Sequence, residues 1–301
     1  MNLYGQEPEA MLLGAFLSHL DHRTVIDVGA ERGTFSEAML RAGAEDVHAL
    51  EPEPRNVAFL LERFAAQPRV TVHALAATDA DRPMELHLSN DASGAPLSFG
   101  HTILERPGTD EIAWTETIAV EGRSVASLVA AGALPRRVGI VKIDTEGHDA
   151  AVIAGMGEIE CDVVMLEHWT DLPNSLGPCP WTVDEIVSAL RPRGFSQYAF
   201  IEHRGEFVVL KWADGQVDPG HMGNLVFLHD RAAGALLPDV LACASQLAAA
   251  AVGVGEMYAA AAVERLALIE QLEQECELRL RAYEELAASI VTPPAGGESA
   301  E

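Results

Sequence analysis

The sequence predicts a doubly wound α/β fold, built on a mostly parallel sheet with an antiparallel edge. Short apolar runs alternate with segments in which apolar residues recur every three or four positions, as expected of strands alternating with helices. Two runs, at 138–144 and 161–167, are predominantly apolar, which is typical of strands buried on both faces. The last three runs, at 195–201, 206–212 and 223–228, follow one another without a long helix and therefore predict the antiparallel edge.

The first part of the chain repeats a strand–turn–helix pattern. The run TVIDV at 24–28 ends at Gly29, and apolar residues at helical spacing follow within 33–43. We expect a second strand at 46–50, a helix after the two prolines that follow it, and a third strand at 69–75.

This regularity weakens between Asp79 and Glu116, where glycine, proline, serine and aspartate are frequent. We expect one peripheral strand at 84–88 and a long loop in the remainder of this segment. Loops of this length in compact domains are often functional, so the segment is a candidate substrate-binding lid. A mobile, solvated insertion is the alternative interpretation.

Regular structure resumes after this segment. Helices are expected near 124–131 and 148–156, on either side of the buried strand at 138–144. Thr182 and Glu185 have the spacing of a capping box, which predicts a helix that starts there and runs toward Arg191.

Beyond Arg231 the composition shifts to alanine, leucine and glutamate. We therefore divide the chain into a globular domain at 1–231, a helical extension at 232–291 and a disordered tail at 292–301. An apolar stripe in the extension predicts a coiled coil and favours a homodimer through the C-terminal helices, with folding back onto the body as the alternative. The stripe consists of Val263, Leu266, Ile269, Leu272, Cys276, Leu280, Tyr283 and Leu286.

The composition limits the partners of the chain. Hydrophobic residues make up 49% of the sequence, enough for a sizeable core, but no run approaches the roughly 20 apolar residues that span a bilayer. The N-terminus lacks the pattern of a signal peptide, so we expect a cytoplasmic protein that binds no membrane. A net charge of −26 repels phosphate backbones and argues against a nucleic-acid partner. The four cysteines are too widely spaced for a zinc motif and are expected to be reduced thiols.

The first turn indicates the kind of ligand. It reads DVGAERG at 27–33, and Gly29 and Gly33 allow a sharp turn and a close approach of the backbone to a ligand. A dinucleotide site would need a glycine at the position of Glu31, because its diphosphate lies against bare amides, whereas a carboxylate repels it. The turn therefore suits a cationic ligand without phosphate.

S-adenosylmethionine is such a ligand, because it carries an ammonium and a sulfonium group. Asp27, at the tip of the first strand, is placed to attract the ammonium directly or through water. Glu51 closes the second strand, where a carboxylate can accept hydrogen bonds from both ribose hydroxyls. We therefore expect S-adenosylmethionine to be the cofactor.

A further motif, KIDTEGHD at 142–149, gathers carboxylates and a histidine at the carboxyl end of a central strand, where open parallel sheets bind ligands. Together with the motifs IDVGAERGTFS, LEPEPRN and LAATDAD and with a later Gly155, it resembles the FkbM family of methyltransferases. The resemblance extends over about residues 20–230, and KIDTEG is its most specific part.

The resemblance implies the Rossmann-like sheet of a class I methyltransferase and S-adenosylmethionine as cofactor. It also implies methyl transfer to a hydroxyl or carboxyl oxygen of a small-molecule, saccharide or polyketide-type acceptor. Asp144 and Glu146 would line the reaction centre. Cofactor contacts are implied at Asp27, Gly29, Ala30, Gly33, Glu51, Asn56, Ala76, Ala77 and Asp144.

The match to the family has one departure. His148 stands where a small residue is common, although Asp149 keeps the acid that follows it. Glu167 matches a family acid that ends the fifth strand, whereas His168 has no counterpart.

Methyl transfer to an aliphatic hydroxyl requires a general base. Asp144 is one candidate, and His148 and His168 are others because imidazole titrates near neutral pH. Asp144, Glu167 and His168 at the ends of adjacent strands also suggest a divalent-metal site, as an alternative to the metal-free site that we favour.

Two other functions are considered from the sequence alone. An NAD-dependent oxidoreductase would share an acid such as Glu51, but Glu31 opposes its diphosphate. A non-catalytic interaction module would use the sheet as a scaffold and the terminal helices to recruit a partner. The presence of Asp27, Gly29 and Asp144 argues against such a loss of the site.

Overall fold

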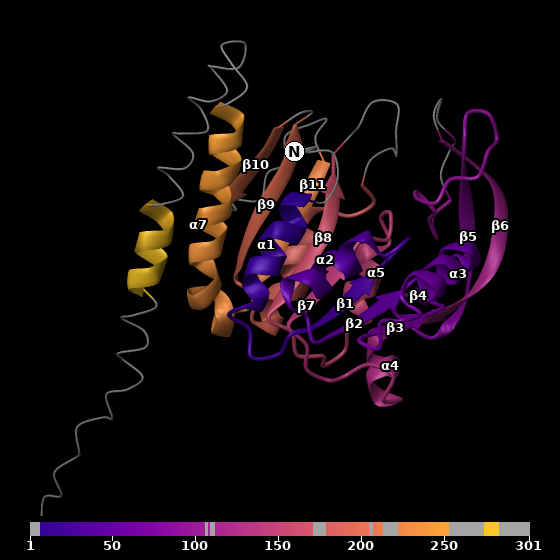
Figure 1. Cartoon of the computed structure of the whole chain (residues 1–301), viewed down its shortest axis with the longest axis horizontal. Helices are drawn as coiled ribbons and strands as arrows, with labels where there is room; N and C mark the ends of the chain where they lie inside the picture. The colour runs from indigo at the N-terminus through magenta and orange to yellow at the C-terminus, as the bar shows by residue number, and fades with distance from the viewer. Residues whose placement is uncertain are drawn as a thin grey trace, which may run out of the picture.

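The computed structural model describes residues 7–105, 108, 112–170, 179–204, 207–212, 222–252 and 274–282. Its main sheet has eight strands in the order β10-β9-β11-β8-β7-β1-β2-β3, and Figure 1 shows helices packed on both of its faces. The strands are β1 (Thr24–Val28), β2 (Asp46–Leu50), β3 (Val70–His73), β7 (Ile140–Ile143), β8 (Val163–Trp169), β9 (Gln197–Arg204), β10 (Phe207–Trp212) and β11 (Met222–Leu228).

The direction of the strands confirms the predicted architecture. The five strands from β3 to β8 run parallel, whereas β11, β9 and β10 pair antiparallel at one edge. All eight strands correspond to expected runs. The central strands are the easiest to predict because apolar residues such as Val25, Ile26, Val163 and Val164 are buried on both faces.

Two apolar clusters hold the helices to the two faces. On one face Leu13, Met39, Leu60 and Leu236 come from four helices: α1 (Glu7–Leu17), α2 (Thr34–Ala42), α3 (Pro54–Arg63) and α7 (Asp230–Val252). The other face is covered by α4 (Val125–Ala130), α5 (Asp149–Ala154) and α6 (Val183–Leu190), followed by the short 3₁₀ helix η1 (Arg191–Arg193). The capping box of Thr182 and Glu185 is present at the start of α6.

A second, smaller sheet corrects the expected loop. Its order is β4-β6-β5, with β4 (Ala76–Ala77), β5 (Arg82–Asp91) and β6 (Ile112–Arg123), and Figure 1 shows β5 and β6 as a long pair beside the main sheet. The single strand expected at 84–88 is the middle of β5, but the expectation of a loop throughout the remainder was wrong. Most β6 side chains are exposed or half-buried, so its sequence has no apolar run to reveal it.

The C-terminal part of the chain is described in two pieces. Helix α7 packs on α1 and β10, so the first part of the predicted extension contributes to the core of the domain. A helical segment at 274–282 buries Cys276 against the same cluster, while Leu278 and Leu280 are exposed. The other residues of the predicted stripe and the predicted tail lie outside the described residues, and the coiled coil stays a prediction. Within the described ranges, no helix is both long and apolar enough to cross a membrane.

Candidate active site

The turn after β1 brings two loops into close contact. The amides of Gly29 and Ala30 donate to the carbonyl oxygen of Leu50, at 2.9 and 3.1 Å. Gly29 has a φ of 75°, and a Cβ there would lie 1.8 Å from the carbonyl oxygen of Asp144. Only glycine therefore fits between the first strand and the loop after β7. Gly33 meets a similar restriction, because a Cβ there would lie 2.6 Å from the ring of Phe64.

A buried lysine connects the DVGAERG turn at 27–33 to the KIDTEGHD motif at 142–149. Nζ of Lys142 lies 3.2 Å from Oδ1 of Asp27 and 3.3 Å from Oδ2 of Asp144, and it donates to the carbonyl oxygen of Gly29 at 3.1 Å. Burial opposes the charge on Lys142, but the carboxylates of Asp144 and Asp27 raise its pKa above the usual value. Lys142 therefore stays charged and fixes the loop after β1 against the loop after β7.

This arrangement corrects the role expected of Asp27. Its side chain is fully buried, with Ser36 donating to Oδ2 at 2.6 Å and Lys142 paired with Oδ1. Asp27 does not line the cleft described below, which argues against a direct contact with a ligand ammonium and leaves the contact through water as a prediction. Its partner Lys142 is 115 residues further along the chain, which is why the sequence pattern alone suggested a ligand contact.

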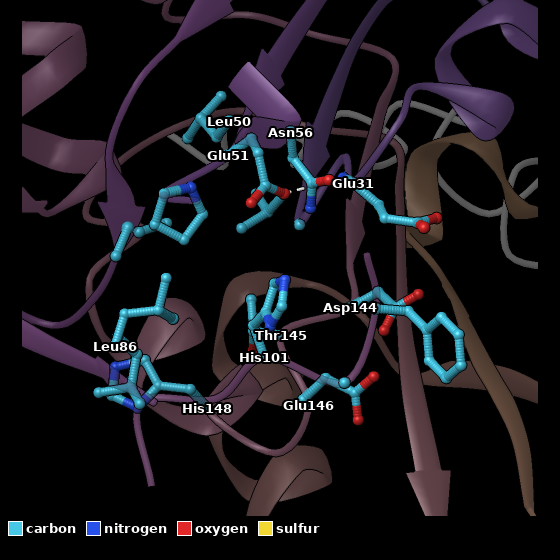
Figure 2. A pocket seen from close by; sticks show the side chains of 18 of the residues that line it. Glu31, Leu50, Glu51, Asn56, Leu86, His101, Asp144, Thr145, Glu146 and His148 are labelled. Atoms are coloured by element: carbon cyan, nitrogen blue, oxygen red, sulfur yellow. Dashed lines mark hydrogen bonds between the residues drawn. The ribbon is translucent and has the colours of Figure 1, made fainter. Parts of the chain in front are cut away.

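A cleft lies over the carboxyl ends of β1, β2 and β7. Its empty space, counted to the open mouth, is about 710 Å³. Figure 2 shows Glu31, Glu51 and Asn56 on one side of it and Asp144 and Glu146 on the other. Eight predicted residues line it together: Gly29, Glu51, Asn56, Ala76, Ala77, Asp144, Glu146 and His148. Four further predicted residues do not: Ala30, Gly33, Glu167 and His168.

Glu51 is held as expected of a carboxylate that binds ribose. Its Oε2 accepts the amide of Glu31 at 2.8 Å and its Oε1 accepts the amide of Glu53 at 2.9 Å. Each carboxylate oxygen has a second lone pair, so two further hydrogen bonds can be accepted. Burial raises the pKa of Glu51 to about 7 despite these amides.

The segment of residues 98–103, here called the strap, crosses the cleft between β5 and β6. The hydroxyl of Ser98 donates to Oε1 of Glu31 at 2.7 Å. The carbonyl oxygen of Ser98 accepts from Nδ2 of Asn56 at 2.8 Å. At its other end, Thr102 donates to the carbonyl oxygen of Glu146 at 3.1 Å. The strap lies in the segment expected to act as a lid, but no residue of it was singled out from the sequence. Its only sequence signal is the glycine- and serine-rich composition.

Backbone strain also concentrates at the cleft. Among the described residues other than glycine, Glu31 and Glu146 have a positive φ, of 50° and 54°. Such conformations cost energy and persist where the surroundings enforce them, often at functional sites. Both of these residues line the cleft, and both are tied to the strap.

The two candidate histidines differ in position. His148 lines the cleft with Nε2 3.0 Å from Oγ1 of Thr78, and burial lowers its pKa. His168 lies outside the cleft and packs on Trp181, with 4.7 Å between ring centroids, and burial lowers its pKa to about 4. His168 therefore lies apart from the cleft, because its side chain points to the face of the sheet that α6 covers, and its role as a base stays a prediction.

The carboxylates near Asp144 strongly influence one another. Burial, followed by the negative charges of Asp144, Glu146 and Asp149, raises the pKa of Glu167. Burial and Asp144 raise the pKa of Asp149 to about 7. The described part of the chain contains no group of three side chains arranged to hold a metal ion. Glu167 and His168 are consecutive in β8 and point to opposite faces, so the alternative metal site with Asp144 does not form.

The order of the strands and the position of the cleft define a Rossmann-like class I methyltransferase fold. The model of the methyltransferase FkbM domain matches residues 27–196, which is more than half of the chain. The chain therefore belongs to the FkbM methyltransferase family. Membership in this family argues against the NAD-dependent oxidoreductase considered above. No curated protein matches the sequence.

Solved structures with a similar fold are methyltransferases of low sequence identity. One is a precorrin-6Y C5,15-methyltransferase from Geobacter metallireducens, with 15% identity, a TM-score of 0.40, and coverage of 76% of this chain and 90% of that chain. A magnesium protoporphyrin IX methyltransferase from Synechocystis with bound S-adenosylmethionine has 11% identity, a TM-score of 0.40, and coverage of 74% and 78%. An S-adenosylmethionine-dependent methyltransferase from Aquifex aeolicus has 14% identity, a TM-score of 0.36, and coverage of 74% and 89%. At these TM-scores, the similarities say nothing about the substrate of this chain.

Proposed function

We propose that this protein is an S-adenosylmethionine-dependent O-methyltransferase that methylates a hydroxyl or carboxyl of a small-molecule, saccharide or polyketide-type acceptor. The observation that carries the proposal is the charge of the cleft. Among the described residues, its lining includes the carboxylates of Glu31, Glu51, Asp144 and Glu146 but no lysine or arginine. Such a lining attracts a nucleoside with ammonium and sulfonium groups and repels a diphosphate.

The residues of the cleft fit this cofactor group by group. Glu51 has lone pairs for the ribose hydroxyls, and the glycine-lined turn at Gly29 leaves room for the chain that carries the ammonium. Glu31 and Asp144 supply negative charge near that turn. The apolar side chains of the lining suit the two faces of a purine ring: Val28, Leu50, Pro52, Leu75, Ala76, Ala77, Leu86 and Ile103.

The bound cofactor would supply an electrophilic methyl group, and the protein's contribution is positioning and proton transfer. Holding the acceptor oxygen in line with the methyl group in a cleft shielded from water provides most of the acceleration in such displacements. The strap narrows the cleft and supports this shielding.

We assign the general base to Asp144. It lines the cleft, and its loop is held in place by Lys142, which keeps the carboxylate at a defined position. Figure 2 shows His148 toward Leu86, among the apolar residues proposed to hold the purine, whereas Asp144 lies at the opposite end below Glu31. His148 and Glu146 are therefore proposed to shape the two ends of the cleft.

Calorimetry tests the cofactor. Wild type should bind S-adenosylhomocysteine, the product of the reaction, and should not bind NADH. Glu51→Ala should weaken binding of S-adenosylhomocysteine at least tenfold, because a loss of two charge-assisted hydrogen bonds costs about 1.5–3 kcal/mol each. Glu45→Ala, which removes an exposed carboxylate paired with Arg23, is the matched control and should bind as wild type does. Binding of NADH together with no response to S-adenosylhomocysteine would overturn the proposal.

Mass spectrometry tests the reaction. Incubation with S-adenosylmethionine and a panel of hydroxylated metabolites and glycans should give a product heavier by one methyl group. Asp144→Asn should then lower turnover by about two to four orders of magnitude, the usual contribution of a general base, while cofactor affinity changes less. Equal losses of turnover and affinity would assign Asp144 to binding instead.

We also propose the setting in which the enzyme works. Its negative charge supports a cytoplasmic protein that binds neither nucleic acid nor membranes. The exposed Leu278 and Leu280 in the C-terminal helical segment support a homodimer formed through these helices.

A further inference from the structure

Two polar atoms in the lining of the cleft are buried and without a partner. Neither Nε2 of His101, in the strap, nor Oγ1 of Thr145, in the loop after β7, has a hydrogen-bond partner among the described residues. Both residues line the cleft, and Figure 2 shows both between Glu51 and Glu146. Leaving such an atom unsatisfied costs about 1–3 kcal/mol, a cost that a ligand of the cleft would relieve.

The contacts of His101 determine which of its two ring nitrogens carries the hydrogen. The amide of Ser89 donates to Nδ1 of His101 at 3.0 Å, so Nδ1 must be the unprotonated nitrogen. The hydroxyl of Ser89 also lies 3.0 Å from Nδ1, but its single hydrogen is donated to the carbonyl oxygen of Phe99. Burial lowers the pKa of His101 and keeps the ring neutral. Nε2 is therefore a fixed N–H donor and cannot serve as a general base.

Thr145 offers the complementary capacity. Its hydroxyl has two lone pairs and one rotatable hydrogen, so it can accept a hydrogen bond from an amine. The two residues come from different elements, and the strap holds His101 over the loop that carries Thr145, since the neighbouring Thr102 is bonded to Glu146. A ligand that contacts both residues would offer an acceptor atom beside an amine.

The surroundings of His101 indicate which part of a ligand lies there. The charged groups that act on it are Glu53 and Arg55, which follow the ribose-binding Glu51 along the chain. Leu50, Leu75, Leu86 and Ile103 add apolar surface to the same cleft. This combination suits a flat heteroaromatic ring with a polar edge.

We propose that His101 and Thr145 recognise the amine-bearing edge of the adenine ring of the cofactor. The N–H of His101 donates to a ring nitrogen next to the exocyclic amine, and the hydroxyl of Thr145 accepts from that amine. This inference rests on the proposed function. Both atoms are shielded from water as the strap stands, so the ring reaches them when the strap moves outward and closes again.

Four nucleosides test these contacts by calorimetry. The reference is S-adenosylhomocysteine; its 1-deaza and 7-deaza analogues each lack one ring nitrogen beside the amine, and its 6-deamino analogue, which has purine in place of adenine, lacks the amine alone. Wild type should bind one of the two deaza analogues about tenfold more weakly than the reference, the worth of one hydrogen bond to a buried donor. It should bind the 6-deamino analogue about tenfold more weakly as well.

Variants of the protein show which residue is responsible for each loss of affinity. In His101→Ala the weakening caused by the deaza analogue should disappear, and in Thr145→Val the weakening caused by the 6-deamino analogue should disappear. His87→Ala and Thr117→Val are matched controls, because this pair is hydrogen-bonded on the second sheet outside the cleft and should leave every ratio unchanged. Since the readout is a ratio of affinities within one protein, a general loss of stability does not imitate it.

The outcomes separate this inference from the proposed function. One contrary result is that wild type binds S-adenosylhomocysteine but shows the same affinity for all four nucleosides, and another is that the losses of affinity for the analogues persist in the variants. Either result overturns the roles of His101 and Thr145, while the proposed cofactor stands. If wild type binds none of the four, the proposed cofactor fails and the inference fails with it.

Discussion

Lys142 determines the geometry of the site more than any residue that lines it. Its ammonium group is almost completely buried and pairs with Asp27 and Asp144, which end two neighbouring strands. Removing one partner of a buried ion pair leaves an uncompensated charge in the interior. The position of the cleft-lining Gly29 therefore depends on a residue that does not itself line the cleft.

We expect Lys142→Met to destabilise the protein by about 3–5 kcal/mol, because Asp27 loses its buried cationic partner. Urea unfolding followed by circular dichroism measures the change. Arg136→Met is the control: this arginine forms exposed pairs with Glu158 and Glu160, and its loss should cost less than about 1 kcal/mol. A cost for Lys142→Met as small as that of the control would contradict the importance of the buried pair.

Glu51 gives a prediction about pH. Because burial raises its pKa to about 7, the carboxyl is mostly protonated at pH 6 and mostly ionised at pH 8. The ionised form accepts hydrogen bonds from ribose hydroxyls more strongly, so affinity for S-adenosylhomocysteine should rise across this range. Calorimetry should show this rise in wild type and its loss in Glu51→Gln.

Whereas affinity for S-adenosylhomocysteine should rise with pH, the contribution of Glu51 to the stability of the fold should fall with pH. The folded protein holds the proton of Glu51 more tightly than the unfolded chain does, so the contribution of this residue to stability falls as pH rises from about 4.5 to about 7. Glu51→Gln should flatten the fall of stability in this window. A stability curve identical in wild type and Glu51→Gln would contradict the raised pKa.

At the scale of elements, a buried carboxylate ties α1 to the antiparallel edge of the main sheet. Glu9 is fully buried, and its Oε1 lies 2.6 Å from Nε2 of His203 on β9 and accepts from Nδ2 of Asn224 on β11 at 2.9 Å. Although burial opposes it, the contact with Glu9 raises the pKa of His203. The pair thus fixes α1 to the antiparallel edge most strongly when His203 is protonated.

We expect Glu9→Ala to destabilise the protein by about 3–5 kcal/mol, since it leaves His203 and Asn224 without their common partner. The loss should be larger near pH 6 than near pH 8, because the stabilisation by a raised histidine pKa disappears as pH rises through that pKa. Thermal and urea unfolding at both pH values measure this difference, with Glu45→Ala as an exposed control. A loss independent of pH would show that His203 is neutral in the folded protein.

How well each element could be predicted follows its burial. Strands such as β1 and β8 were predicted because their apolar residues are consecutive, whereas β6 was missed because its side chains remain half-exposed. The site shows the same limit. Glu51 and Asp144 were identified from their places at strand ends, but His101 becomes visible only through its bonds to Ser89, which no local pattern encodes.

At the scale of the molecule, the negative charge and the acid-lined cleft act in the same direction. A net charge of −26 repels anions before they reach the cleft, and the carboxylates of the lining repel them again inside it. Both effects favour neutral or cationic acceptors over phosphorylated ones. The panel of acceptors should therefore be weighted toward uncharged polyols and glycans.

The C-terminal helices provide the last prediction, about assembly. Since α7 contributes Leu236 and Val240 to the core, a truncation must follow Val252 to keep these residues, although it removes the packing of Cys276 on the same cluster. We expect full-length protein to sediment as a dimer and the truncated protein as a monomer that still binds S-adenosylhomocysteine. Full-length protein carrying Leu278→Glu and Leu280→Glu should also become monomeric, because charges on these exposed positions oppose an apolar interface. A truncated protein that still sediments as a dimer would move the interface to the domain itself.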